Sequence, residues 1–255
     1  MKRAGLLIRI FTAIFLTIFF AGSAAAEYSR VVTFGADLTG AQRTMLASEF
    51  GVDLTRGEVP VVEITNAEER KYLEGLVSDR LIGNKAISSA LVEMLPQGQG
   101  INVETRNITW VTTNMYENAL VTAGVTDARI VVAAPFPVSG TAALTGIFKA
   151  VEYATGRSLG NKSKKIANEE LVQTGQLGQE IGKEKASRLI LLVKERIVRE
   201  RPKTRVEIRQ IIVNVAGELN INLTKDQIEE ITTLMQKVNG LQLNIGEISR
   251  QINGL

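Results

Sequence analysis

The sequence predicts an α/β fold in which a mixed sheet with flanking helices is followed by a C-terminal helical bundle. Two patterns support this prediction. Short β-branched and apolar runs alternate with helix-like segments between residues 30 and 155, which is typical of layered α/β structure. After Gly156 the strand-like alternation stops, and apolar residues recur at helical spacing. We therefore expect an α/β domain over residues 27–156 and a helical domain over residues 157–255.

The first part supplies both strands and helices. Strands are expected at residues 30–34, 58–65, 86–95, 101–109 and 128–134. Helices are expected at residues 39–50, 66–77, 113–123 and 139–154. Thr39 and Gln42 have capping-box spacing, Asn66 is the expected cap of the second helix, and Gly124 and Gly156 end the last two. Because residues 96–100 form a turn, the strands on either side of it are predicted to pair as a hairpin.

The second part shows three apolar stripes with the period of an α-helix. Pro202 separates the first stripe from the second, and Thr224 with Gln227 caps the third helix. A final short helix is expected at residues 245–252. Helices of this length need packing partners, which predicts a small bundle. The stripes are Ala186, Leu189, Ile190, Val193 and Ile197; Ile208, Ile211, Ile212, Val215 and Leu219; and Ile228, Ile231, Leu234, Met235 and Val238.

The composition excludes several kinds of chemistry. The chain contains no Cys and no His. It therefore has no disulfide framework, thiolate nucleophile, Ser-His-Asp triad or His-ligated zinc. We expect no enzymatic activity, no metal and no cofactor.

The first 26 residues have the pattern of a secretory signal peptide. Lys2, Arg3 and Arg9 precede an apolar run over residues 10–20, and residues 21–26 are small. Cleavage is predicted after Ala26, and the alternative is a permanent membrane anchor. A secreted chain without Cys fits an extracellular or bacterial cell-envelope setting.

The charge of the remaining chain is balanced overall but divided. Without the three basic residues of the leader, the chain contains 27 Lys and Arg residues and 27 Asp and Glu residues. Residues 27–155 carry 15 acidic and 10 basic side chains, whereas residues 156–255 carry 12 acidic and 17 basic ones. This asymmetry suggests a basic surface for an anionic cell-wall polymer or a membrane surface. Nucleic acid is not an expected partner, because the protein is predicted to be exported and lacks interleaved aromatic residues.

Three sets of residues are candidates for binding. Each set also has a purely structural alternative. For the basic residues it is a helix face with i,i+4 ion pairs (Glu184–Arg188, Glu195–Arg199). For the residues at a helix start it is a helix cap, and for the residues around Trp110 it is a turn beside a core Trp. The basic set is Lys185, Arg188, Arg199, Arg205 and Arg209. The second set, Ser139, Gly140 and Thr141, follows a buried strand and opens a helix, where backbone N–H groups can bind an anion. The third is Asn107, Thr109 and Trp110, with Thr112, Thr113 and Asn114, which suit a glycan or peptide groove.

The residues also leave two other function classes open. One is a carboxylate-based hydrolase acting on wall glycan or peptide, for which the candidates are Glu104, Glu117, Asp127 and Glu152. The other is an assembly module whose C-terminal helices pair with a helix of a protein partner. The expected function is a secreted, non-enzymatic, cell-envelope-associated or extracellular binding protein.

Several motifs together carry a resemblance to a known family. They are Phe34-Gly-Ala-Asp-Leu-Thr39 with Gln42, Ile82-Gly83 with Lys85-Ala-Ile-Ser-Ser89, Gly100-Ile101 with Asn107-Ile-Thr109, Met115-Tyr116 with Asn118-Ala-Leu120 and Thr122-Ala-Gly124, and Val138-Ser-Gly-Thr-Ala-Ala-Leu-Thr-Gly146. Over about residues 30 to 200 the chain resembles the YpuA-like secreted proteins of Gram-positive bacteria, a domain of unknown function. The resemblance implies export and an α/β plus helical layout. It implies no activity and no catalytic residues.

Overall fold

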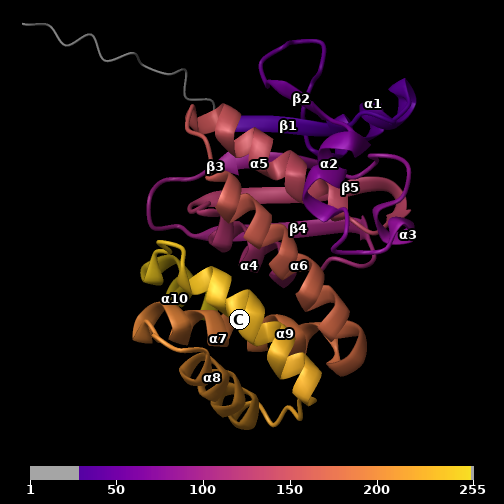
Figure 1. The fold of residues 1–255 in the computed structure, drawn as a ribbon. Helices are drawn as coiled ribbons and strands as arrows, with labels where there is room; N and C mark the ends of the chain where they lie inside the picture. The colour runs from indigo at the N-terminus through magenta and orange to yellow at the C-terminus, as the bar shows by residue number, and fades with distance from the viewer. Residues whose placement is uncertain (1–28, 254–255) are drawn as a thin grey trace, which may run out of the picture.

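One mixed sheet organises the first part of the chain. The computed structural model describes residues 29–253, so the expected leader lies outside the described residues. Within that range, five strands form a sheet in the order β2-β1-β3-β5-β4 (Figure 1). They are β1 (Arg30–Gly35), β2 (Val61–Ile64), β3 (Ser89–Met94), β4 (Ile101–Ile108) and β5 (Ala128–Val138). β2 is parallel to β1 and β4 is parallel to β5, whereas β3 is antiparallel to both of its neighbours. The predicted mixed sheet is confirmed.

The predicted hairpin is wrong, because β5 lies between β3 and β4. β3 and β4 do follow each other across the 96–100 turn, but β4 pairs in parallel with β5 through the crossover helix α4 (Thr113–Ala123). The Asp127 carboxylate fixes the turn to the start of β5 by accepting from the N–H groups of Gly98 and Gly100, at 2.9 and 2.7 Å. Since residues 128 and 130–134 are all buried, β5 takes an interior position and β4 takes the edge.

Helices cover both faces of the sheet. Alternate residues of β5 point to opposite faces: Ile130 and Val132 pack in the core that α4 and α5 share, and Val131 and Ala133 pack in the core that contains α1 residues. Figure 1 shows α5 running across one face of the sheet. The other helices of this part are α1 (Gly40–Glu49), α2 (Asn66–Leu73), α3 (Asp79–Ile82) and α5 (Thr141–Thr155).

The helix ends follow the sequence closely, with one correction. The capping box of Thr39 and Gln42 is present. The cap of α2 is not Asn66 but Thr65, whose capping-box partner is Glu68. Asn66 is thereby the first helical residue, and its side chain is free to reach Glu69.

Five further helices form the predicted C-terminal bundle. They are α6 (Asn161–Ile181), α7 (Lys183–Glu200), α8 (Arg205–Glu218), α9 (Lys225–Asn239) and α10 (Ile245–Asn253). The three apolar stripes face one another in a common core, except that Ile228 and Leu219 lie at its margin. The Thr224–Gln227 capping box is confirmed. Helix α6 packs against both α4 and the bundle (Figure 1). Across residues 29–253, the structure shows no helix with the length and apolar character needed to cross a bilayer.

Candidate functional site

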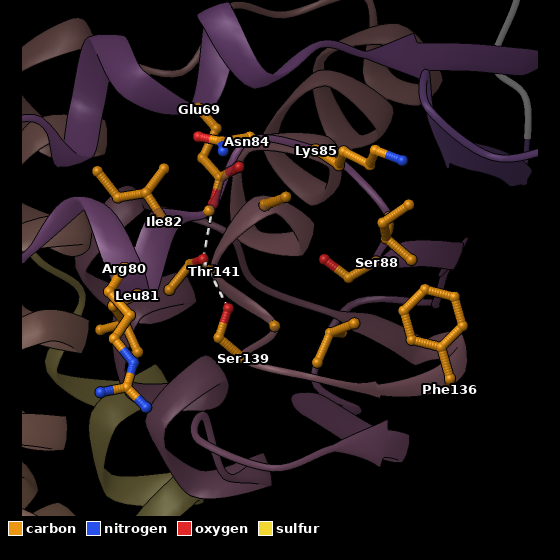
Figure 2. Close-up of a pocket in the computed structure, with 15 residues that line it drawn as sticks. Glu69, Arg80, Leu81, Ile82, Asn84, Lys85, Ser88, Phe136, Ser139 and Thr141 are labelled. Atoms are coloured by element: carbon orange, nitrogen blue, oxygen red, sulfur yellow. Dashed lines mark hydrogen bonds between the residues drawn. The ribbon is translucent and has the colours of Figure 1, made fainter.

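A cavity of about 480 Å³ opens where β5 leads into α5. It is lined by the start of α5, with residues of α3 on one side of Thr141 and the segment that leads into β3 on the other (Figure 2). The predicted residues Ser139, Gly140 and Thr141 all line it. The remaining lining residues that matter below are Glu69, Arg80, Lys85, Ile87, Ser88 and Phe136.

The start of α5 depends on Gly140. This residue has φ 96°, in the left-handed region that favours glycine. A Cβ here would lie 2.4 Å from Cγ2 of Ile108 and 2.6 Å from the Tyr116 hydroxyl. That hydroxyl donates to the Gly140 carbonyl at 2.5 Å. The backbone therefore turns into the helix at a position where only glycine fits.

No side chain caps α5, so the cap interpretation of Ser139 and Thr141 is wrong. The Thr141 hydroxyl instead donates to Oε1 of Glu69 at 2.6 Å, and Ser139 Oγ lies 3.1 Å from Thr141 Oγ1 (Figure 2). Among the described residues, the backbone N–H groups of Thr141 and Ala142 also have no hydrogen-bond acceptor. These donors are the usual unsatisfied groups of a helix start, and here they border a cavity.

Glu69 is a buried acid in the lining of the cavity. Its side chain is fully buried, and its Oε2 accepts from Nδ2 of Asn66 at 3.3 Å. Burial raises the pKa of Glu69 from its ordinary value of 4.5 to about 7, against the opposing effects of the Thr141 and Asn66 hydrogen bonds and the Arg70 charge. Glu69 was not predicted from the sequence. The available signal was its four-residue spacing from the buried Leu73, which places both on one face of α2.

Ser88 is a buried polar side chain that lines the cavity without a partner in the described part of the chain. It is only 4% exposed, and no residue of the described chain forms a hydrogen bond with its hydroxyl. Figure 2 shows this hydroxyl pointing into the cavity, between Thr141 and Phe136. The oxygen is not sealed from solvent, because it borders the open cavity. It is therefore available to donate to a ligand atom that enters the cavity.

The rim of the cavity is positive. Arg80 and Lys85 are exposed, lie on opposite sides and extend outward (Figure 2). Neither forms an ion pair with any residue between 29 and 253. Glu69 is the acid that lines the cavity. Arg70 nearby is already engaged, since its guanidinium pairs with Asp79 at 2.7 Å.

The burial of Glu69 predicts a specific dependence of stability on pH. The folded protein holds the Glu69 proton up to about pH 7, whereas the unfolded chain releases it near its ordinary pKa. The stabilisation is therefore complete below the unfolded-state pKa and is lost as the pH rises through about 7. The free energy of unfolding of Glu69→Gln, relative to the unsubstituted protein, should rise by about 3 kcal/mol across this range. Urea unfolding of both proteins on either side of the range measures it, and a constant difference would contradict it.

The third predicted set, Asn107, Thr109 and Trp110, does not line the cavity at the start of α5. Trp110 is 8% exposed, and its ring packs so closely on α6 that a Cβ at Gly175 would lie 2.3 Å from it. Asn107, at a bulge with φ 57°, donates to the Ala134 carbonyl at 2.8 Å. Thr109 donates to the Val138 carbonyl at 2.9 Å. These residues hold the ends of β4 and β5 together beside the cavity, and the aromatic face is not open for stacking.

The basic candidates are dispersed over the helical part. Arg199 pairs with Glu195, as the i,i+4 alternative predicts, and Arg205 and Arg209 both pair with Glu229. Lys185 and Arg188 are exposed, and the predicted Glu184–Arg188 pair is absent from the described residues.

Each of the four candidate carboxylates forms a separate local hydrogen bond or ion pair. Two bind backbone N–H groups: Glu117 accepts from Val103, and Asp127 accepts from the 96–100 turn described above. Glu104 and Glu152 form ion pairs, with Arg129 at 2.9 Å and Lys164 at 2.8 Å. Residues 29–253 contain no group of three or more His, Cys, Asp or Glu side chains that could hold a metal ion.

The fold and the cavity together define an α/β protein with a C-terminal helical bundle and a pocket at the start of one helix. The chain belongs to the family described as "Protein of unknown function (DUF1002)", whose model matches residues 34–255. It is 39% identical over 230 residues to "Uncharacterized protein YpuA" of Bacillus subtilis (strain 168), a match that covers 90% of this chain and 78% of that protein. The resemblance to YpuA-like proteins is therefore confirmed. No solved structure matches the chain.

Proposed function

We propose that this protein is exported and acts by binding the anionic group of an extracellular or cell-envelope ligand in the cavity at the start of α5. Export is supported by the pattern of residues 1–26. It is tested by whether the native protein begins at Glu27. Binding without bond-making is supported by the missing Cys and His and by the separate structural contacts of the four candidate carboxylates.

The unpartnered hydroxyl of Ser88 is the observation that carries the proposal. It points into a space that is also bordered by the free N–H groups of Thr141 and Ala142. Three convergent donors at the positive end of a helix form an environment that favours negative charge. Arg80 and Lys85 add unpaired positive charge at the rim and can swing inward from the exposed surface.

The apolar part of the cavity indicates what carries the anionic group. Ile87 lines the interior, and Phe136, with 44% of its surface exposed, lies at the rim. An aromatic face at the edge of a polar site suits a sugar ring or another partly apolar body. Carboxylated glycans and phosphodiester polymers both combine such a body with an anion.

Two small anions test the binding site. Acetate represents a carboxylate and dimethyl phosphate represents a phosphodiester, and either is titrated into the full mature chain while its amide NMR spectrum is recorded. We expect shifts at the Thr141 and Ala142 amides. Ser88→Ala should weaken binding roughly tenfold, because it removes a hydrogen bond to a charged group. Ser48→Ala, the same change at an exposed serine on α1, should leave binding unchanged.

Paired charge variants then separate this cavity from the basic face of α7. Arg80→Gln with Lys85→Gln should weaken anion binding, whereas Lys185→Gln with Arg188→Gln should not. The opposite outcome would assign binding to α7 and overturn the proposed site. Absence of any shift with either anion would overturn it as well.

The alternative of a helical assembly module is supported only by a small exposed apolar surface on the bundle. In the described part of the bundle, the large apolar side chains that are exposed are Val206, Val213 and Ile245. Val206 and Val213 are seven residues apart and so share one face of α8. Two valines cover little area compared with a stable protein interface, and the cavity is therefore the better supported site.

A further inference from the structure

Glu69 and the anion cavity share one hydroxyl group. Thr141 lines the cavity, and its hydroxyl donates to Glu69 at 2.6 Å. A hydroxyl has a single proton to donate. While Glu69 is ionised it uses that proton, so Thr141 presents only acceptor lone pairs to the cavity. An anion placed there would meet an acceptor instead of a donor, with a buried negative charge behind it.

Protonation of Glu69 reverses this arrangement. The protonated carboxyl can donate to Thr141 Oγ1, and the Thr141 hydrogen can then rotate toward the cavity. Ser139, at 3.1 Å from Thr141 Oγ1, can likewise donate into the cavity. The same two residues thereby change from competing with an anion to binding it, without movement of the backbone.

The groups around Glu69 do not neutralise its charge by direct contact. On its own helix, Asn66 is neutral, and Arg70 binds Asp79 of α3 and the carbonyl of Gly83. From α4, the Tyr116 hydroxyl donates to Gly140, and burial raises the pKa of that phenol. From α3 and the segment before β3, Arg80 and Lys85 extend outward at the rim. From α5, the contact is the Thr141 hydroxyl.

We propose that binding of an anion in this cavity is coupled to uptake of one proton by Glu69. The inference rests on the proposed function and specifies its regulation: affinity falls as the pH rises above neutrality, and the ligand is released in alkaline conditions. Glu69 acts through Thr141 and is a positioning residue for the bound anion.

Calorimetry with dimethyl phosphate tests the coupling, because the charge of this anion is constant across the working range. The mature chain is titrated at about pH 5.5 and about pH 8.5 in buffers of different ionisation enthalpy. We expect uptake of close to one proton per bound anion at the higher pH and close to none at the lower. Affinity should fall as the pH rises, by up to tenfold for each pH unit above the pKa of Glu69.

Two variants make the assignment specific. Glu69→Gln retains the acceptor for Thr141 and cannot ionise, so it should bind at both pH values without proton uptake. Glu68→Gln, at the half-buried neighbouring position, should keep the proton uptake of the unsubstituted chain. Binding without proton uptake, or a pH dependence that persists in Glu69→Gln, would overturn this inference and leave the proposed function standing. Absence of binding at both pH values would overturn the two together.

Discussion

Replacement of Lys194 by methionine should destabilise the protein by about 3–5 kcal/mol, because it leaves a carboxylate alone in the interior. Lys194 on α7 and Glu170 on α6 are both fully buried, and their Nζ and Oε1 atoms lie 2.6 Å apart. The contact is an ion pair without good hydrogen-bond alignment at Oε1. Lys194 also donates to the Asn118 carbonyl at 2.7 Å, and Thr122 donates to Glu170 at 2.5 Å. The cluster thus joins α6, α7 and α4.

Denaturant unfolding of three variants tests this expectation. Lys194→Met should be severely destabilised, since burial raises the pKa of Glu170 and the remaining acid must either ionise unpaired or take up a proton. The double variant Lys194→Met with Glu170→Met should recover much of the loss, because apolar side chains can replace a buried pair. Arg196→Met removes the exposed pair with Glu218 and should cost less than about 1 kcal/mol. Equal losses for Lys194→Met and Arg196→Met would refute the buried-pair argument.

Replacement of Gly140 by alanine should cost about 3 kcal/mol in the free energy of unfolding. The left-handed backbone contributes roughly 1–2 kcal/mol, and the overlap of the new methyl group with Ile108 and Tyr116 contributes roughly 1–3 kcal/mol. The overlap should also displace the start of α5 and weaken anion binding in the cavity.

Gly124 provides the matched control for this substitution. It ends α4 with φ 88°, and no atom lies within 4 Å of the position that its Cβ would occupy. Gly124→Ala therefore carries the backbone cost alone, roughly 1–2 kcal/mol. Chemical denaturation of both variants gives the difference, which measures the close contact. If the two losses were equal, the close contact at Gly140 would carry no energy.

Local features of the fold could be predicted because their causes are local. The capping boxes at Thr39 and Thr224 depend on residues three positions apart, and the helix end at Gly124 depends on one residue. The apolar stripe of α7 likewise depends on spacing alone. The pairing of β3 with β5 could not be predicted in this way, because a turn between two strand-like runs looks the same whether the strands are neighbours or lie on either side of a third.

Helix α6 shows why part of the structure could not be predicted from the sequence. Its buried face includes Asn168, Glu170 and Thr174, and polar residues do not register in a search for apolar periodicity. The candidate site was only half predicted for a similar reason. Ser139, Gly140 and Thr141 were identified because they adjoin a helix start, whereas Glu69 and Ser88 come from segments 72 and 53 positions away from Thr141. Tertiary contact alone gives these two residues their significance.

Helix α6 also links the cavity to the rest of the molecule. Its Val172 packs with Leu73 of α2 and Ile82 of α3, two of the helices that contribute residues to the cavity, and its Leu177 belongs to the core of the bundle. Helix α6 therefore packs both against helices beside the cavity and into the core of the bundle. Binding of a ligand in the cavity should therefore raise the melting temperature of the whole chain, in a single cooperative transition. The bundle would thus contribute to the stability of the binding site.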